Sequence, residues 1–258
     1  MARLASVPHE CVANPSPESS GVAGNIGTVS KLSAATSDQF GRERVEQIRA
    51  TLREWATGHV RRLPWRRPLP IWKALVAEVM LLRTRANQVV AAFVAFDARY
   101  LTPTEFGSAS EQDLRALLAP LGLRWRVPLL LRLAKEIGRC GGQLPLDQKS
   151  LELLPGVGQY AAAATLSLHA GIPAVLIDAN TVRVIARLLG KSFDGETRRK
   201  GWLRAAADEL TPRDGNREFN YALLDLAASV CRPRRPRCGE CPLRRWCVTG
   251  MQVETSAD

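Results

Sequence analysis

Four of the six cysteines lie close together near the end of the 258-residue chain. Cys231, Cys238, Cys241 and Cys247 have the spacing C-x6-C-x2-C-x5-C, so their thiolates can surround one centre. The start of the chain lacks a basic segment followed by an apolar run, so we expect no secretory signal and a reducing compartment in which disulfides are rare. A metal site is the better interpretation. The wide outer spacings favour an iron–sulfur cluster and leave zinc open.

Two carboxylates stand out because their neighbours carry no charge. Asp178 ends the uncharged stretch 153–177 and begins an amphipathic helical pattern. It can be an ordinary N-cap, or an ionised group held at the edge of a cleft. Glu78 is the only charged residue between Ala74 and Leu82. Glu78 therefore either extends to solvent or lines an apolar pocket that favours its protonated form, which suits a general acid.

A short turn motif, Leu154-Pro155-Gly156-Val157-Gly158, separates two helical patterns. Its glycines fit a turn that needs positive φ or a close backbone approach. A turn that opens onto a helix leaves backbone N–H groups free for phosphate oxygens, although an ordinary helix–helix turn has the same residue types. Together with Gly171 and Pro173, these breaks leave too short an apolar helix to cross a membrane.

The chain is basic, with 36 Lys and Arg against 25 Asp and Glu, a net charge of +11. Residues 1–38 are rich in Ser, Pro, Gly and Ala without hydrophobic periodicity, so we expect a disordered tail. Residues 39–247 alone contain 34 basic and 20 acidic residues, a net charge of +14. A surplus of this size indicates a polyanionic partner, either nucleic acid or an acidic membrane surface.

Helical rather than alternating periodicity continues through almost all of the chain from residue 39, so the sequence predicts an all-α fold. His169 falls in a buried helical pattern and is interpreted as a core residue, and Trp125 is expected to pack rather than to stack on a base. Pro- or Gly-containing connectors separate the predicted helices, which are residues 39–58, 71–87, 89–100, 110–119, 125–139, 148–154, 159–170, 179–189, 197–210 and 217–230.

The cysteine spacing resembles that of the [4Fe–4S] cluster in the endonuclease III and adenine glycosylase branch of the helix-hairpin-helix DNA glycosylases. The resemblance implies that the four cysteines bind such a cluster. It also implies that the basic loop between the first two cysteines contacts the DNA backbone through Arg232, Arg234, Arg235 and Arg237. The turn motif resembles the family's hairpin. This implies that Pro155, Gly156, Val157 and Gly158 contact phosphate, with a monovalent cation bridging the hairpin carbonyls and the DNA.

The surroundings of the two carboxylates also resemble this family. Ile177-Asp178-Ala179-Asn180 is similar to a segment with an invariant catalytic Asp, which implies that Asp178 stabilises the cationic sugar and positions water, with Asn180 beside it. Ala77-Glu78-Val79-Met80-Leu81 resembles a segment whose Glu faces the extruded base, which implies that Glu78 binds or protonates that base. Arg83 aligns with the wedge that opens the base stack, and an exposed helix Arg is the alternative.

Tyr160 distinguishes between branches of the family. Endonuclease III has a Schiff-base lysine at this position, so the resemblance implies hydrolysis without strong strand cleavage. Adenine glycosylases usually have a small residue here and a further C-terminal domain, for which the eleven residues after Cys247 leave no room. We therefore expect a monofunctional glycosylase that removes thymine or uracil opposite guanine, with Tyr160 against the flipped base. An adenine glycosylase acting opposite guanine or 8-oxoguanine and a non-catalytic DNA-binding homologue are the alternatives.

The resemblance further implies a two-lobed fold with the active site in the cleft. The expected organisation is a disordered tail at 1–38, an iron–sulfur cluster domain at 39–67 plus 178–247, a six-helix domain at 68–177 that contains the hairpin, and a short tail at 248–258. The expected partner is double-stranded DNA with a mismatched or damaged base, bound by a monomer in the cytoplasm, and not a membrane.

Overall fold

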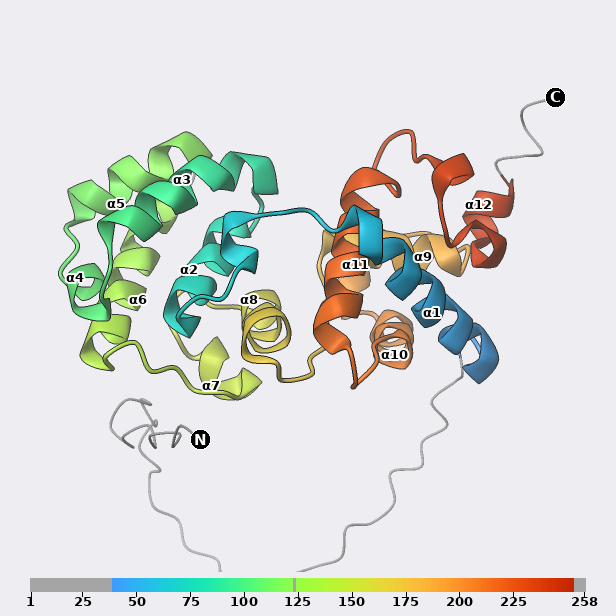
Figure 1. Ribbon diagram of the computed structural model, residues 1–258, viewed down its shortest axis with the longest axis horizontal. Coiled ribbons are helices and arrows are strands. Elements are labelled where there is room, and N and C mark those ends of the chain that lie inside the picture. The colour runs from blue at the N-terminus through green and yellow to red at the C-terminus, as the bar shows by residue number, and fades with distance from the viewer. Residues whose placement is uncertain (1–38, 123, 253–258) are drawn as a thin grey trace, which may run out of the picture.

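The computed structural model describes residues 39–122 and 124–252, and the predicted disordered tail lies outside them. Within these two ranges the chain forms helices and turns and no strand, in agreement with the all-α prediction. The helices form two lobes, and residues 60–70 and 171–178 connect them (Figure 1). No helix in this part of the chain is long and apolar enough to span a membrane.

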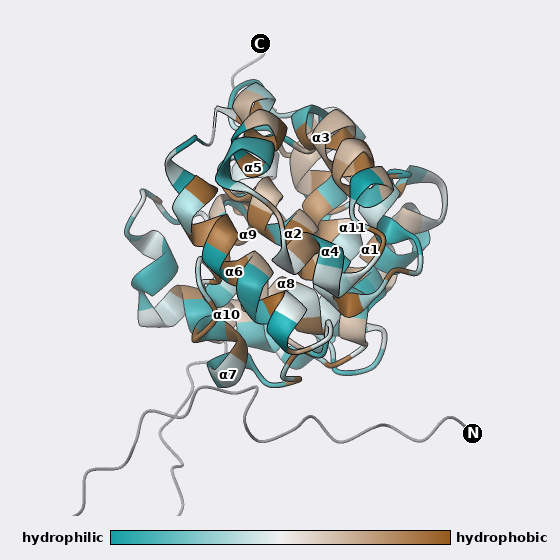
Figure 2. Cartoon of the chain, turned by 90° about the vertical axis from the view of Figure 1, so that its left-hand side faces the viewer, coloured by the Kyte–Doolittle hydropathy of each residue, from teal (hydrophilic) through white to brown (hydrophobic). Residues whose placement is uncertain are grey.

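The first lobe surrounds an aromatic core. Trp72, Phe93, Phe96 and Phe106 are at most 3% exposed, and their ring centroids lie 5.2 to 5.9 Å apart in contacting pairs. Figure 2 views this lobe end-on, with its hydrophobic stretches turned toward the middle of the group of helices. Its helices are α2 (Ile71–Leu81), α3 (Ala86–Arg99), α4 (Pro103–Gly107), α5 (Glu111–Leu118), α6 (Val127–Arg139), α7 (Gln148–Glu152) and α8 (Gln159–Ala164), which continues as the π-helical turn Thr165–Ala170.

The second lobe has a separate, mostly aliphatic core that includes Ile48, Leu52, Leu203 and Leu226. Its helices are α1 (Arg42–His59), α9 (Ala179–Leu188), α10 (Gly201–Leu210), α11 (Asn216–Ser229) and α12 (Val248–Gln252). A smaller cluster with Leu168 and Leu176 packs against Tyr221 of α11 between the two cores. Two cores with one junction agree with a two-lobed fold, while the exact domain boundaries stay a prediction.

Three local features differ from the sequence-based expectations. The predicted helix 71–87 ends at Leu81, and α3 begins only at Ala86, so Arg83 lies in a turn rather than on a helix. Helix α4 is not predicted from the sequence, although Thr102 and Glu105 form a capping box at its N-terminus. Residues 248–252, predicted as the start of a short tail, form α12 and pack against α9.

Helices α4 and α6 meet backbone to backbone. A Cβ atom on Gly107 would lie 2.8 Å from the Cα of Gly138, which is closer than real Cβ contacts allow. The absence of side chains at these two positions therefore permits the crossing. Because α6 is anchored in this way, the chain after it reaches the hairpin from a fixed direction.

A buried carboxylate on α11 binds the connection between the lobes. Asp225 is fully buried, and its two oxygens accept hydrogen bonds from Arg66 at 2.7 and 2.9 Å and from the Arg61 side chain and backbone at 2.6 and 2.9 Å. Burial raises the pKa of Asp225, but the hydrogen bonds and charges of Arg66 and Arg61 outweigh it and hold the pKa below its ordinary value. Asp225 thus attaches residues 61–66 to α11.

We predict that Asp225→Asn lowers the free energy of unfolding by about 3 kcal/mol, because it leaves two arginines facing a neutral amide in a buried site. Since the pKa of Asp225 is lower in the folded than in the unfolded chain, its contribution is present above about pH 4 and is lost as the pH falls through the folded value. Urea unfolding at neutral and acidic pH measures both effects. Equal stability of the two proteins at neutral pH would contradict the prediction.

Candidate active site and cysteine site

Glu78 lies in the middle of α2 and is 1% exposed. Its Oε1 is 2.9 Å from Nε2 of His169, in the π-helical turn that follows α8. Its Oε2 is buried and has no hydrogen-bond partner among the described residues. A buried carboxylate with one committed and one free oxygen is an unusual arrangement, because buried polar atoms are normally paired. The free oxygen is available to a group that enters from outside the protein.

Asp178 is the N-cap of α9 and is partly exposed. Its Oδ1 accepts hydrogen bonds from the backbone N–H groups of Asn180 and Thr181 at 2.9 and 2.8 Å, and its Oδ2 accepts one from Asn180 Nδ2 at 2.6 Å. Burial raises the pKa of Asp178, and these hydrogen bonds partly offset the rise. Asp178 can therefore be both the N-cap of α9 and a functional carboxylate.

Tyr160 lies near both carboxylates. Burial, and after it the negative charges of Glu78 and Asp178, raise the pKa of Tyr160 well above its ordinary value, so its hydroxyl stays protonated. Tyr221 of α11 also faces this site: burial and the charge of Glu78 raise its pKa to about 12, and its ring lies 4.3 Å from the Arg66 guanidinium carbon. The structure thus gathers side chains from α2, α8, α9 and α11 where the two lobes meet.

These groups can carry out acid–base chemistry on a bond between them. Asp178 is held by three hydrogen-bond donors that favour its charged form, whereas Glu78 lies in a dry pocket with only the His169 ring as partner. Two carboxylates in such different surroundings suit the two roles of glycoside hydrolysis, one as a stabilising anion and the other as an acid.

The hairpin has a single position that requires glycine for its backbone. Gly156 has a φ of 77° and faces Leu129 of α6, 3.3 Å from where a Cβ would lie. Gly158 has an ordinary φ of −106° and is the N-cap of α8, with open space around it. The predicted need for positive φ therefore applies to Gly156 only. At Gly158 the small residue leaves the start of α8 accessible, while Pro155 is partly exposed and Val157 is buried.

Arg83 and Trp125 lie on two exposed turns of the first lobe. Arg83 has a φ of 59°, which is uncommon for a residue with a side chain and is often found at functional sites. Trp125 was expected to pack rather than to stack on a base, but it is 59% exposed and does not pack in the core. Its ring lies 4.6 Å from the guanidinium carbon of Arg126, whose Nη1 donates to the carbonyl of Val79 at 2.9 Å. Arg126 thereby attaches this turn to the end of α2.

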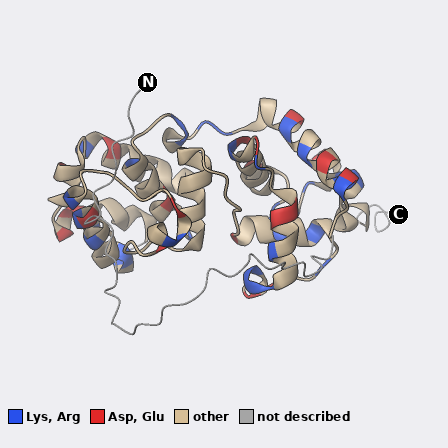
Figure 3. Cartoon of the chain, turned by 90° about the horizontal axis from the view of Figure 1, so that it is seen from below, with Lys and Arg blue, Asp and Glu red and all other residues tan. Residues whose placement is uncertain are grey.

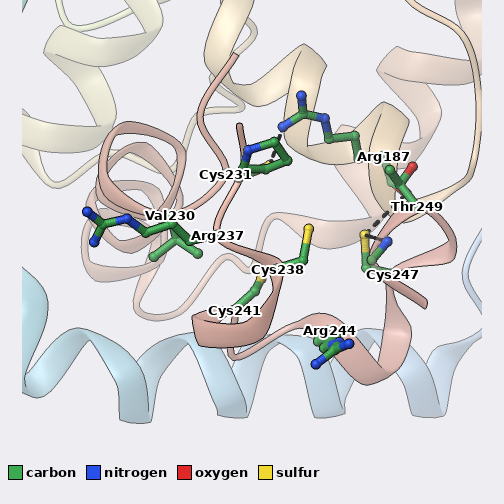
Figure 4. Close-up of a pocket in the computed structure, with 11 residues that line it drawn as sticks. Arg187, Val230, Cys231, Arg237, Cys238, Cys241, Arg244, Cys247 and Thr249 are labelled. Atoms are coloured by element: carbon green, nitrogen blue, oxygen red, sulfur yellow. Dashed lines mark hydrogen bonds between the residues drawn. The ribbon is translucent and has the colours of Figure 1, made fainter. Parts of the chain in front are cut away.

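The four predicted metal-binding cysteines line one pocket of about 300 Å³, measured with the open space at its mouth. Figure 4 shows them arranged around it, with Arg187 of α9 at its edge. Burial, and then the proximity of the other three sulfurs, raise the pKa of Cys241 to about 11. Four thiols at this density bind strongly to cationic metal centres, which remove their protons. The donor set fits an iron–sulfur cluster.

Helix α9 connects the cysteine site to Asp178. Arg183 is buried and donates to Asn180 Oδ1 at 3.1 Å and to the carbonyl of Cys231 at 2.8 Å. One turn further along, Arg187 Nη1 lies 3.3 Å from the Cys231 sulfur and 2.7 Å from the Arg232 carbonyl. Asn180 thus hydrogen-bonds to both Asp178 and Arg183 through its side chain.

The basic loop after Cys231 divides its arginines between two roles. Arg232 is partly buried and donates to the carbonyl of Ser229, whereas Arg234, Arg235 and Arg237 are exposed. Arg235 has a φ of 49°, and Arg237 forms an exposed pair with Glu240 at 3.3 Å. Basic residues are also dense along the connection between α1 and α2 (Figure 3). Part of the positive surplus is therefore on surfaces that a polyanion can reach.

Comparison with known proteins is consistent with this geometry. Residues 231–247 match the iron–sulfur binding domain of endonuclease III. The chain is 39% identical over 211 residues to the thymine-DNA glycosylase of Aeropyrum pernix, a match that covers 80% of this chain and 95% of that protein. The chain belongs to the helix-hairpin-helix DNA glycosylases. This family membership establishes DNA as the partner and residues 231–247 as an iron–sulfur domain.

Other relatives of this DNA glycosylase support the same family. The thymine/uracil-DNA glycosylase of Methanothermobacter thermautotrophicus is 32% identical over 81% of this chain and 96% of its own length. The human adenine DNA glycosylase is 31% identical over 81% of this chain, which spans 40% of that protein. A solved thermostable thymine-DNA glycosylase superposes with a TM-score of 0.74 at 29% identity, over 84% of this chain and 99% of the other.

Sequence reasoning missed several residues of the glycosylase site. His169 pairs with Glu78 across 91 positions and is not simply a core residue. Arg187 is separated from Cys231 by 44 positions, and Tyr221 lies on a helix without a recognised motif. The signal available for His169 was its polar ring in an otherwise uncharged stretch, the same signal that drew attention to Glu78.

We predict that Arg187→Met weakens iron retention by about 10–100-fold, because it removes the guanidinium beside the Cys231 sulfur. Iron content and visible absorption during incubation with a chelator measure the effect. Arg199→Met is the matched control, since Arg199 is exposed and pairs only with Glu196 three residues earlier. Equal iron loss in the two variants would contradict the prediction, and a colourless protein with stoichiometric zinc would show that the cysteines bind zinc instead.

Proposed function

We propose that this DNA glycosylase hydrolyses the N-glycosidic bond of thymine or uracil opposite guanine in double-stranded DNA, as a monofunctional enzyme of base excision repair. The observation that carries the proposal is the pair of carboxylates in unlike surroundings near Tyr160: Asp178 is held by the N-terminus of α9, and Glu78 is paired with His169 and keeps one free oxygen. The names of the relatives with 39% and 32% identity support the choice of base.

Asp178 stabilises the positive charge that develops on the sugar. Glycosidic bond cleavage passes through an oxocarbenium-like state, which a nearby carboxylate stabilises. The two N–H groups of the α9 N-terminus and the Asn180 amide fix the position of Asp178 and support its charged form. Its partial exposure gives water access, so Asp178 also positions the water that attacks the sugar.

Glu78 binds the departing base and protonates it. The target nucleotide must leave the stack before its glycosidic bond can be reached. The free Oε2 of Glu78 then meets the polar edge of the flipped base, while Oε1 stays bound to His169. Tyr160 packs against the ring of the base. Since Tyr160 provides no amine, a Schiff-base intermediate cannot form on it, and strand cleavage is not part of the reaction.

The surrounding elements hold the duplex. Pro155, Gly156, Val157 and Gly158 present the start of α8 to a phosphate, with a monovalent cation on the hairpin carbonyls when DNA is bound. The exposed loop arginines Arg234, Arg235 and Arg237 contact the backbone, and Arg232 holds the loop in place. Arg83, on its strained turn, enters the stack where the base leaves it.

The cysteine site completes this DNA-binding surface. We assign a [4Fe–4S] cluster to Cys231, Cys238, Cys241 and Cys247, which fits the spacing of the residues and the pocket that they line. When bound, the cluster supplies positively charged iron to four thiolates and closes the loop between the first two. One chain contains every group named here, so the active form is a monomer.

We predict that the protein releases free base from G·T and G·U duplexes, and that Asp178→Asn and Glu78→Gln each lower the single-turnover rate by at least about 100-fold with DNA binding retained. A panel of duplexes with defined lesions, scored separately for base release and for strand breaks, measures the activity. Borohydride treatment during turnover should trap no covalent complex.

The control for Asp178→Asn is Asp147→Asn, which changes the exposed N-cap of α7 in the same way and should leave the rate unchanged. Asn is as good an N-cap as Asp, so both variants keep their helices. Release of adenine opposite 8-oxoguanine without any pyrimidine release would support the adenine alternative. An inert protein with normal DNA affinity would support a non-catalytic DNA-binding homologue.

A further inference from the structure

His169 reaches Glu78 because of an irregular helix. Residues 165–170 form a π-helical turn at the end of α8, and such turns are rare and frequent at functional sites. The wider turn directs His169 toward α2, where its side chain is 6% exposed and that of Glu78 is 2% exposed. Their contact is thus shielded from water, and it joins two helices that are distant in sequence.

The surroundings of the pair contain few charges that could compensate a lone carboxylate. The His169 carbonyl accepts a hydrogen bond from Arg217 Nη2 at 3.1 Å, and the Arg66 guanidinium is engaged with Asp225. On the other packing face of α2, Lys73 and Asp97 of α3 form their own ion pair at 2.6 Å. The titratable and charged groups that face Glu78 and His169 are Tyr160 of α8, Asp178 at the start of α9, Tyr221 and Arg217 of α11, and Arg66 before α2.

A carboxylate and an imidazole in such a site behave as one titrating unit. With one shared proton the pair is neutral overall, either as carboxylic acid and imidazole or as carboxylate and imidazolium. Without that proton the pair has a charge of −1 in a dry site, which is costly. The pair therefore has two forms that keep the proton, whereas a carboxyl group with a neutral amide as its partner has only one.

We propose that His169 shares with Glu78 the proton that is delivered to the departing base, and that the pair rather than Glu78 alone is the acid. This proposal rests on the proposed function. When the glycosidic bond breaks, its electron pair goes to the base nitrogen, and the Oε2–H bond of Glu78 breaks as the base takes the proton. In the form that reacts, carboxylic acid and imidazole, the proton on His169 Nε2 stays on the ring and donates to Oε1, so the step leaves a neutral imidazole and a carboxylate. Since His169 does not contact the base, it is a positioning residue.

Two variants of His169 distinguish the effect of its proton from the effect of its hydrogen bond to Glu78. In His169→Gln, the amide can still donate to Oε1 but cannot supply a proton, whereas His169→Ala removes both. We expect His169→Gln to retain the acidic-pH rate of base release within about tenfold, with the alkaline limb of its pH profile moved down by about one unit or more. His169→Ala should be slower at every pH. His59→Gln is the control, because His59 is exposed at the end of α1.

A profile of His169→Gln that superimposes on that of the parent protein would overturn the proposal. So would a uniform loss of rate without displacement of the alkaline limb, which a purely structural role predicts. Iron content and melting temperature identify any variant that fails to fold.

A second measurement does not depend on activity. In protein with isotope-labelled histidine, the His169 ring should lose its proton at a pH about one unit or more higher in the parent than in Glu78→Gln, because only the parent has a carboxylate partner. The ring of His59 should titrate identically in both proteins. Identical titration of His169 would overturn the shared proton. If the parent releases no base from any mismatch, the proposed function fails, and the ring titration still decides whether the proton is shared.

Discussion

The attachment of Asp225 to Arg61 and Arg66 is the interaction on which the relation of the two lobes depends. It fixes the chain between α1 and α2 against α11 by charge-assisted hydrogen bonds in a site from which water is excluded. Arg66 in turn lies against the ring of Tyr221, whose hydroxyl donates to the Leu168 carbonyl at 3.4 Å, next to His169. The position of α2 relative to α11, and therefore the width of the active site, follows from where this carboxylate is held.

A second constraint acts through α9, whose N-terminus and middle bind different parts of the molecule. Its N-terminus supplies the hydrogen bonds that hold Asp178, and its middle supplies Arg183 and Arg187 to Cys231 and the loop after it. Because one rigid helix makes both sets of contacts, it sets the distance between Asp178 and the iron–sulfur domain. The cysteine pocket and the site around Asp178 are thus connected through one helix.

Much of this arrangement could be predicted from sequence because its signals are local. The cysteine spacing, the P-G-V-G turn and the segment around Asp178 are each contained within a few residues, and helical periodicity indicated the all-α fold. The failures share a cause. Arg83 was assigned to a helix because no Gly or Pro marks the turn after Leu81, and His169 was assigned to the core because its partner lies 91 residues away. A pairing at that distance has no local pattern.

The π-helical turn at residues 165–170 has a consequence for how such a site can be gained or lost. A π turn holds one residue more than the α-helical turn that it replaces, and each residue of an α-helix advances by about 100° around the axis. Deletion of a single residue there would restore regular geometry and rotate His169 away from α2, with no change to either carboxylate. Deletion of one codon would therefore be enough to leave Glu78 of this glycosylase without its imidazole partner.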